Sequence, residues 1–598
     1  MRLFTAFILF SLVSFAQTKN TYHISFENAV HHEANIKATF SNIKTDIFSL
    51  RMSRTSPGRY ALHEFAKNVY NVIATNSKGE AVKITRPNPH QWDISGHDGT
   101  VTISYVLFAD RGDGTYSQID ETHAHLNIPA TFIYAPKRKD QPIDIVFEPR
   151  KDLNWKIATQ LNAIGNNTFT APNLQYFMDS PVELSNHATR EFKVGSNESE
   201  YTIKLALHHL GNEEEVSTYF EKIKKIVVQE KAVFGEYPKF DNGTYTFLAC
   251  YMPQVSGDGM EHRNSTILTS QNSLANEGMK KNIGTVSHEF FHAWNVERIR
   301  PKTLEPFDFE KANMSGELWF AEGFTSYYTG LILCRAGIIS QEQYIKGLKG
   351  SYNYVWNSPA LAYFNPTEMS YQAPFVDAAT SVDPVNRENT FISYYSYGSV
   401  LGLALDLSLR TLKNDRNLDG YMKLIWQKYG KTEVPYSKEN LLTSLQEYAG
   451  DDFANNFFKK YIDDSKIPDY KKLFADFGIV INANSEKSHL GASIKFDKHN
   501  NAIISNYSKQ GTPIYKAGLD KNDIILSLNQ ESFTSQGELS KILEKYKPDS
   551  KIEILYKRFE KEIKTEIILS SDPKIETALL PKPNKKAIEN REKWLTAK

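Results

Sequence analysis

The sequence predicts a multidomain protein of the α+β class. The chain has 598 residues, more than one hydrophobic core ordinarily serves, so several domains are expected. Apolar residues alternate with period two over 101–106, whereas after residue 213 they recur at three- and four-residue spacing. A separate strand-rich segment follows at about 489–569. These observations place β structure toward both ends of the chain and helices between them.

The first residues have the pattern of a signal peptide. Met1-Arg2 supplies positive charge, residues 3–13 are almost all apolar, and Ser14-Phe15-Ala16 has the spacing of small residues that signal peptidase reads. We expect residues 1–16 to be cleaved and the protein to be exported, to the periplasm or the extracellular medium. An uncleaved anchor is the alternative. No later stretch offers about 20 uninterrupted apolar residues, so no transmembrane segment is expected in the mature chain.

Residues 17–210 are predicted to form an antiparallel β domain. Turn signals such as Ser56-Pro57-Gly58 separate its strands, and a further strand-rich stretch at 201–207 places the boundary near residue 210.

Residues 211–480 are predicted to form a second domain with long helices. The Leu-rich stretch 398–412 has the composition of a mostly buried helix. A third, strand-rich domain is expected at 486–572. Residues 573–598, rich in Pro and Lys, are expected to be a polar tail, in which a short helix could end at Trp594-Leu595.

The charge balance bears on the class of partner, and the cysteine content bears on the presence of disulfides. Lys plus Arg and Asp plus Glu each total 70, so the overall charge does not favour nucleic acid as a partner. The two cysteines, Cys250 and Cys334, lie in apolar runs and are interpreted as buried structural thiols. Whether they pair is left open.

The central chemical feature is the run His288-Glu289-Phe290-Phe291-His292. Residues four apart share one face of a helix, so both imidazoles can face one ion. Two imidazoles and a carboxylate hold catalytic Zn²⁺ with an open position, and the ion lowers the pKa of its water to about 7. Glu289 is placed to take the water proton. A helix that carries two histidines by chance is the alternative.

A third ligand is predicted at Glu322. This acid stands alone in the apolar and aromatic stretch 318–328, where a carboxylate is unfavourable unless it has a partner. We therefore predict one Zn²⁺ per chain, held by His288, His292 and Glu322. An exposed Glu at the start of a helix is the alternative.

The runs HEFFHAWN (288–295) and WFAEGFTSYY (319–328) resemble the gluzincin peptidases, whose third zinc ligand is a Glu on a second helix. The spacing from His292 to Glu322 is 30 positions, which is similar to the spacing in the glycyl aminopeptidase family. That family also has a PDZ domain. The resemblance implies an N-terminal β domain, which would include Ser56–Tyr60, then a thermolysin-like (gluzincin) catalytic domain with a helical C-terminal part and a PDZ domain. It also implies a preference for small N-terminal residues such as Gly and Ala.

The segment Gly257–His262 resembles the Gly-x-Met-Glu-Asn element of gluzincin aminopeptidases. In those enzymes the strand binds substrate backbone and the Glu binds the free α-amino group. The match gives these roles to Gly259, Met260 and Glu261. A buried carboxylate that faces an ammonium selects chain ends over chain interiors. An exposed turn with ordinary charges is the alternative.

The segment Ser393–Gly398 is similar to the gluzincin Tyr-x-Lys-Gly element, whose Tyr stabilises the tetrahedral intermediate. The match gives this role to Tyr395, with Tyr394 as the second candidate. Tyr397 departs from the pattern, because Lys is common there. Aromatic packing is the alternative for these tyrosines.

Residues 490–494 and 517–529, followed by a helical stretch at 537–546, look like a PDZ domain. In such a domain a loop offers N–H groups to a terminal carboxylate, and the peptide adds as a strand. The expected partners are therefore peptide substrates and, at this module, peptide or protein C-termini.

The combined expectation is an exported zinc aminopeptidase that acts on peptides. Two alternatives stay open. One is a zinc endopeptidase that recruits substrates through its PDZ domain. The other is a catalytically silent peptide-binding protein on a peptidase scaffold.

Overall fold

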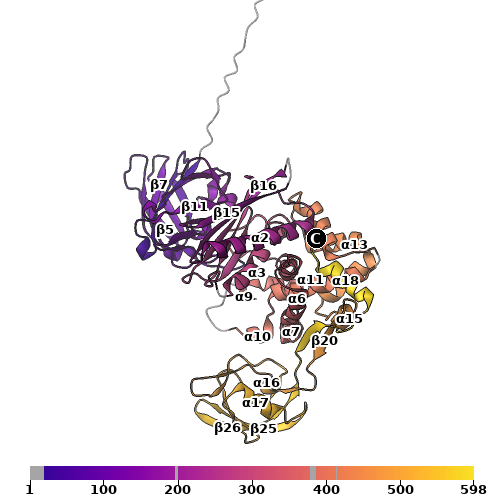
Figure 1. Ribbon diagram of the computed structural model, residues 1–598. Helices are drawn as coiled ribbons and strands as arrows, with labels where there is room; N and C mark the ends of the chain where they lie inside the picture. Colours follow the sequence, from indigo (N-terminus) through magenta and orange to yellow (C-terminus); the bar gives the residue numbers. More distant parts are fainter. Residues whose placement is uncertain (1–18, 196–198, 276, 377–384, 413) are drawn as a thin grey trace, which may run out of the picture. The chain divides into compact units, whose positions relative to one another are not determined.

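The computed structural model describes residues 19–195, 199–275, 277–376, 385–412 and 414–598 (Figure 1). The signal peptide predicted at residues 1–16 lies outside the described residues. The chain divides into two compact units, and the shorter one comprises the residues up to Ser56 together with Glu64–Ala188. The longer unit comprises Pro57–His63 and Thr189–Lys598. Within the described part of the chain, no helix is long and apolar enough to cross a membrane.

The first unit consists of β sheets, as the alternating pattern predicts. Its seven-stranded sheet has the order β12 (Asn162–Ala163), β13 (Thr168–Ala171), β10 (Ile143–Phe147), β1 (Asn20–Ser25), β2 (Glu33–Phe40), β7 (Val101–Phe108), β4 (Val69–Thr75). A four-stranded sheet has the order β11 (Lys156–Thr159), β14 (Val182–Ser185), β9 (His123–Leu126), β8 (Gln118–Ile119). A third sheet has the order β3 (Ile47–Arg51), β6 (Gln91–Ser95), β5 (Lys83–Asn88).

The pairing in this unit is antiparallel with one described exception. Strand β1 pairs with β10 in parallel, and strands β1 and β2 pair antiparallel. Parallel neighbours need a long connection, and more than a hundred residues separate β1 from β10. Along β7, burial alternates with period two, so the pattern at 101–106 corresponds to one core-facing side of a strand.

The second unit begins with a mixed five-stranded sheet. Its order is β15 (Ala188–Val194), β16 (Tyr201–His209), β17 (Thr244–Tyr251), β19 (Ser265–Thr269), β18 (Asp258–His262). Strand β17 pairs in parallel with β16 and β19, and β18 pairs antiparallel with β19. Helix α2 (Glu213–Phe234) connects the parallel strands β16 and β17, as a crossover must. The boundary expected near residue 210 therefore falls between β16 and α2, inside this unit.

Three helices position the candidate site: α3 (Gly278–Phe291), α5 (Gly323–Arg335) and α11 (Tyr394–Thr411). Helices α5 and α11 cross at two glycines. A Cβ added at Gly398 would lie 2.6 Å from Gly323 Cα, and one added at Gly323 would lie 2.9 Å from Tyr394 O. The absence of side chains at both positions lets the two backbones touch.

The remaining helices fill out both units. They are α1 (Leu174–Met178) in the first unit, and in the second α4 (Leu318–Ala321), α6 (Gln341–Gly347), α7 (Lys349–Trp356), α8 (Pro366–Tyr371), α9 (Ala373–Val376), α10 (Arg387–Thr390), α12 (Leu418–Ile425), α13 (Lys438–Ala449), α14 (Asp451–Phe457) and α15 (Tyr470–Ala475). The prediction of a multidomain α+β protein is confirmed.

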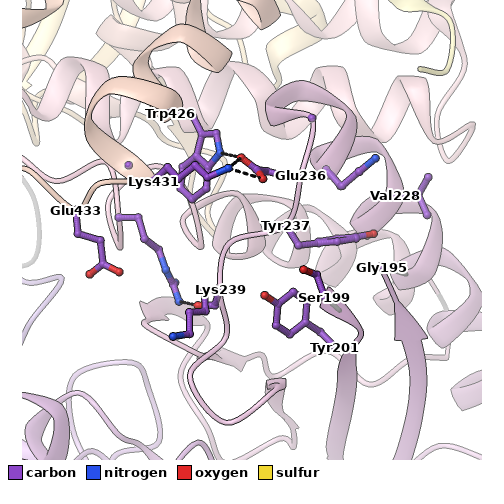
Figure 2. Close-up of a pocket in the computed structure, with 14 residues that line it drawn as sticks. Gly195, Ser199, Tyr201, Val228, Glu236, Tyr237, Lys239, Trp426, Lys431 and Glu433 are labelled. Atoms are coloured by element: carbon purple, nitrogen blue, oxygen red, sulfur yellow. Dashed lines mark hydrogen bonds and ion pairs between the residues drawn. The ribbon is translucent and has the colours of Figure 1, made fainter. Parts of the chain in front are cut away.

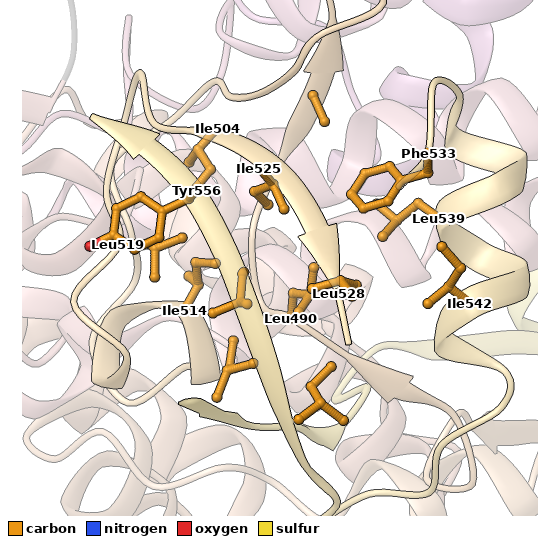
Figure 3. Close-up of a cluster of buried hydrophobic side chains, with 14 of the residues drawn as sticks. Leu490, Ile504, Ile514, Leu519, Ile525, Leu528, Phe533, Leu539, Ile542 and Tyr556 are labelled. Carbon is orange, nitrogen blue, oxygen red and sulfur yellow. The ribbon is translucent and has the colours of Figure 1, made fainter. Parts of the chain in front are cut away.

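The strand-rich module near the C-terminus has its own core. Its sheet has the order β22 (Ile494–Phe496), β23 (Ala502–Ile504), β24 (Ile524–Leu528), β25 (Lys551–Arg558), β26 (Lys561–Ile568), with helices α16 (Pro513–Lys516) and α17 (Gln536–Leu543). Figure 3 shows Leu539 and Ile542 of α17 beside Leu528 and Phe533, and these side chains are buried. Burial of one apolar face on each element accounts for a compact module.

After this module the chain continues into ordered structure, where a polar tail with room for one short helix was predicted. Strand β28 (Ile575–Leu579) pairs with β20 (Ile479–Ala483), and β27 (Ser570–Ser571) pairs with β21 (Ser488–His489). Helix α18 (Lys585–Leu595) follows, and its Trp594 is fully buried. The Trp594 indole N–H donates to Tyr327 Oη at 2.9 Å. The polar composition of this segment belongs to the exposed side of a helix whose few apolar residues face a core.

Both cysteines are free and buried. Burial raises the pKa of Cys334 to about 11, so its thiol stays protonated and unreactive. The interpretation as structural thiols therefore fits both positions, and they do not form a disulfide.

Candidate metal centre

The HExxH run lies at the end of α3. His288 and Glu289 are in the last turn, and His292 caps the helix. Glu322 stands between α4 and α5, where it is the residue before the first turn of α5. Its Oε2 lies 3.2 Å from His292 Nε2 and 3.7 Å from His288 Nε2. One ligand atom from each of the three side chains lies within 4.8 Å of the others, a spacing that can hold a metal ion.

The far nitrogen of each imidazole is already engaged. Nδ1 of His292 donates to Asn295 O at 2.6 Å. Nδ1 of His288 lies 3.2 Å from Thr329 Oγ1, whose own hydroxyl donates to Thr325 O. Because the carbonyl and the threonine oxygen accept hydrogen bonds, Nδ1 carries the proton in both rings. In the neutral form of each ring, Nε2 then keeps the lone pair that a metal ligand needs.

The site concentrates negative charge. Against the effect of burial, the carboxylates of Glu322 and Glu261 raise the pKa of His292 to about 10. Burial lowers the pKa of His288. Also against the effect of burial, His292 and His288 hold the pKa of Glu322 below its usual value. Several buried carboxylates against two imidazoles favour a dication. The residues therefore fit a divalent metal in both ligand type and charge.

The carboxyl group of Glu289 lies near His292, but it does not belong to the group formed by the three predicted metal ligands. Glu261, Glu289 and His292 form a second group whose ligand atoms lie within 4.8 Å of one another. Glu289 is 6% exposed, and its Oε2 has no hydrogen-bond partner among the described residues. Burial and the neighbouring carboxylates of Glu261 and Glu322 raise its pKa well above the usual range. An unpartnered buried carboxyl oxygen of raised pKa is suited to exchange protons with water.

Strand β18 presents the Gly-x-Met-Glu segment beside α3. A Cβ added at Gly259 would lie 2.7 Å from Glu289 Cδ and from Thr285 Cγ2, so only glycine fits between the strand and the helix. Met260 and Glu261 are buried at 1% and 6% exposure. Burial raises the pKa of Glu261. The structure thus brings Gly259, Met260 and Glu261 together with the HExxH helix.

The two tyrosine candidates lie at the start of α11. The Tyr395 ring is half-buried, with its centroid 5.9 Å from that of His288. Tyr394 is fully buried and stacks on Tyr395 at 4.9 Å between centroids. The contact between α5 and α11 brings the Tyr394 carbonyl oxygen against Gly323, the residue that follows Glu322. Tyr395 is the more accessible of the two to a bound substrate.

Two supporting residues were missed by reasoning from sequence. Asn295, the last residue of the HEFFHAWN run, donates from Nδ2 to Phe320 O and Ala321 O, and so ties the end of α3 to the segment before Glu322. The hydroxyl of Tyr60 donates to Glu322 Oε1 at 2.6 Å. Asn295 could have been noticed because it adjoins the motif. Tyr60 carries no such signal, because 262 positions separate it from Glu322.

A cavity of about 880 Å³ in the second unit lies apart from these residues (Figure 2). Figure 2 shows Lys431 and Trp426 directed toward Glu236, and both donate to its Oε1 at 2.9 Å. None of the predicted site residues lines this cavity. Arg298, which follows the HExxH run, lines it and donates to Ala293 O and Lys239 O. It therefore has a structural role.

Three segments of the chain match known families. Residues 21–186 match the peptidase M61 N-terminal domain, residues 281–401 match M61 glycyl aminopeptidase, and residues 488–569 match the PDZ domain. No curated protein sequence matched the chain.

A solved structure shares the fold over nearly the whole chain, and another is a weaker match. An aminopeptidase N family protein from Idiomarina loihiensis is 22% identical with a TM-score of 0.84, over 96% of this chain and 100% of that one. An M1 zinc metallopeptidase variant from Deinococcus radiodurans, bound to a Tyr-Ser-Ala substrate, is 13% identical with a TM-score of 0.43, over 76% of this chain and 95% of that one.

The fold and the site together define a metallopeptidase. The chain carries segments that match the N-terminal domain and the glycyl aminopeptidase domain of peptidase family M61 and a segment that matches the PDZ domain, as the motifs in its sequence predicted.

Proposed function

We propose that this chain is a zinc-dependent aminopeptidase that removes small N-terminal residues, Gly or Ala, from peptides. The observation that carries the proposal is the position of Glu261. Its carboxylate is grouped with Glu289 and His292, so a buried anion stands next to the group that would activate water. A buried carboxylate at this distance can anchor the α-ammonium of a substrate and place the first peptide bond at the metal.

One Zn²⁺ would be held by His288, His292 and Glu322. Such an ion, when bound, would act as a Lewis acid and lower the pKa of its bound water. The hydrogen bonds from His288 and His292 to Thr329 and Asn295 hold both rings in the tautomer that leaves Nε2 free for it.

The proton transfers belong to Glu289. Its Oε2 is buried and free to accept the proton of the attacking water, and its raised pKa allows it to hold that proton. The same carboxyl then gives the proton to the nitrogen of the leaving amine. Residues that perform both transfers work best with a pKa near the working pH.

Two further groups orient the substrate. The Tyr395 hydroxyl would donate to the oxygen that becomes negative as water adds to the carbonyl. Strand β18, through Gly259 and Met260, would pair with the substrate backbone. The preference for a small N-terminal residue rests on the family match at residues 281–401.

The test is hydrolysis of Ala-p-nitroanilide beside its N-acetylated form, with the protein brought to full zinc content. We expect cleavage of the free-amine substrate alone. Glu289→Gln should lower kcat by about 10²–10⁴-fold with zinc retained, since a general acid–base group contributes this much. Glu261→Gln should act mainly on KM of the free-amine substrate. Cleavage of the acetylated substrate would instead indicate an endopeptidase.

We also propose that the protein is exported and that its PDZ domain binds peptide C-termini. Strand β22 pairs with β23 on one side and ends the sheet on the other, which is the edge that a peptide strand would join. Fluorescence anisotropy with peptides that differ only in a free or amidated C-terminus would test the binding. Equal affinity for both would exclude terminal recognition.

A further inference from the structure

One short segment leaves the first unit and packs in the second. Residues 57–63 lie inside the stretch that matches the N-terminal domain of the family, 21–186. Yet Pro57–His63 group with the second unit, whereas the residues on either side, up to Ser56 and from Glu64 on, group with the first. We call Pro57–His63 the strap.

The strap reaches the metal ligands through Tyr60. Its hydroxyl donates to Oε1 of Glu322 at 2.6 Å, while Oε2 of the same carboxylate faces His288 and His292. Tyr60 and Glu322 are 3% and 2% exposed. Because each carboxylate oxygen faces a different group, the hydrogen bond fixes the rotation of the carboxylate and so the direction of Oε2.

The ring of Tyr60 is itself held in place. It packs edge-on against Tyr394, with 5.9 Å between centroids and an interplanar angle of 84°. The phenol therefore connects the third metal ligand with the start of α11.

The strap also packs against β18, the strand that carries Glu261. Gly58 has φ of +75°, and a Cβ added there would collide with Met260 Sδ and lie 3.2 and 3.3 Å from the two carboxylate oxygens of Glu261. The next residue, Arg59, forms an ion pair with Asp258 on the same strand. Glycine is required here for two reasons, the left-handed backbone and the close approach.

We propose that the strap is a part of the active site contributed by the N-terminal segment of the chain: Tyr60 is a positioning residue for the metal ligand Glu322, and Gly58 lets the backbone support Glu261. The first half needs only that the site binds a metal. The second half rests on the proposed role of Glu261 as the anchor of the substrate amine.

The first test uses Tyr60→Phe, with Tyr421→Phe as the matched control. Tyr421 is equally buried, and its hydroxyl donates to Leu441 O at 2.7 Å, in contact with no metal ligand. Zinc affinity is measured by competition with a chromophoric chelator, and folding by circular dichroism. Loss of a partner of a metal ligand weakens metal binding by about 10- to 100-fold, which we expect for Tyr60→Phe alone.

The readout separates this inference from the proposed function. If the wild-type protein binds zinc but cleaves neither substrate, the function fails while the affinity of Tyr60→Phe still tests the strap. Wild-type zinc affinity in folded Tyr60→Phe would overturn the positioning role, whatever the peptidase activity. An equal loss in Tyr421→Phe would also overturn it, because the effect would then be general.

The second test compares Gly58→Ala with Gly79→Ala. Gly79 has a similar φ of +82°, but an added Cβ there meets nothing within 4 Å, so the pair shares the backbone strain and differs in the contact. We expect Gly58→Ala to raise KM for the free-amine substrate at least 10-fold, with zinc retained and Gly79→Ala unchanged. Arg59→Gln, which adds no atoms and removes the ion pair with Asp258, should shift KM in the same direction. Wild-type KM in both strap variants would refute the support of Glu261.

Discussion

The contact between the two glycines of α5 and α11 makes a quantitative prediction for Gly398→Ala. A Cβ at this position would overlap the carbonyl oxygen of Trp319 and lie 2.6 Å from Gly323 Cα. Both neighbours are backbone atoms, so a side-chain rotation cannot relieve the overlap and the helices must separate. Alanine is favoured over glycine in a helix by about 1 kcal/mol, whereas overpacking costs about 1–3 kcal/mol. The net loss of stability is therefore only about 0–2 kcal/mol.

The effect on activity should be much larger than the effect on stability. Tyr395 and Tyr394 lie at the start of α11, and Glu322 adjoins α5. A shift of one helix against the other therefore changes the distance from the tyrosines to Glu322. A displacement of about 1 Å in an active site can cost about 100-fold in rate. We therefore expect kcat/KM to fall by about two orders of magnitude, with a small change in the melting temperature measured by calorimetry.

The control is Gly284→Ala in the interior of α3. An added Cβ there meets nothing within 4 Å, so the substitution should gain about 1 kcal/mol of helix stability and leave kinetics unchanged. The reasoning is refuted if Gly398→Ala behaves like Gly284→Ala, with a raised melting temperature and wild-type kcat/KM.

Two further predictions concern stability. Burial lowers the pKa of His187 in the folded state to about 4, whereas its ordinary value is 6.5. The unfolded state therefore binds a proton more readily than the folded state. The stability that neutral His187 gives the first unit is fully present above pH 6.5 and is lost as the pH falls through 4. Urea unfolding at pH 7 and pH 4.5 should show a loss of about 2–3 kcal/mol that His187→Leu abolishes, and an unchanged pH dependence in the variant would contradict this cause. In α18, Trp594→Ala should destabilise the second unit by about 3–5 kcal/mol in thermal unfolding, because the indole is fully buried. Ile588→Ala on the exposed side of the same helix should change stability by less than about 0.5 kcal/mol, and equal effects would show that α18 is not anchored by Trp594.

The candidate metal ligands could be proposed from the sequence because their chemistry is locally encoded. The four-residue spacing of His288 and His292 defines one helix face, and Glu322 stands out as a single acid in an apolar stretch. The PDZ module could be predicted for a similar reason, because its turns and alternating strands are short-range patterns.

Reasoning from sequence was less successful where composition hides burial. Residues 573–598 look like a polar tail, but β28 and α18 bury a few apolar side chains and leave the charged ones in water. The boundary near residue 210 was placed at the end of a strand-rich stretch. Strand propensity, however, does not tell which sheet β15 and β16 join.

The sequence by itself determined which residues can bind a metal and move a proton, because residue type and helical period decide that. Only the tertiary structure decided what holds those residues. The bond from Tyr60 to Glu322, the support of Glu261 by Gly58, and the contact of Gly323 with Gly398 join positions that are distant in the chain. Such contacts depend on how complete elements pack, and no local pattern carries that information.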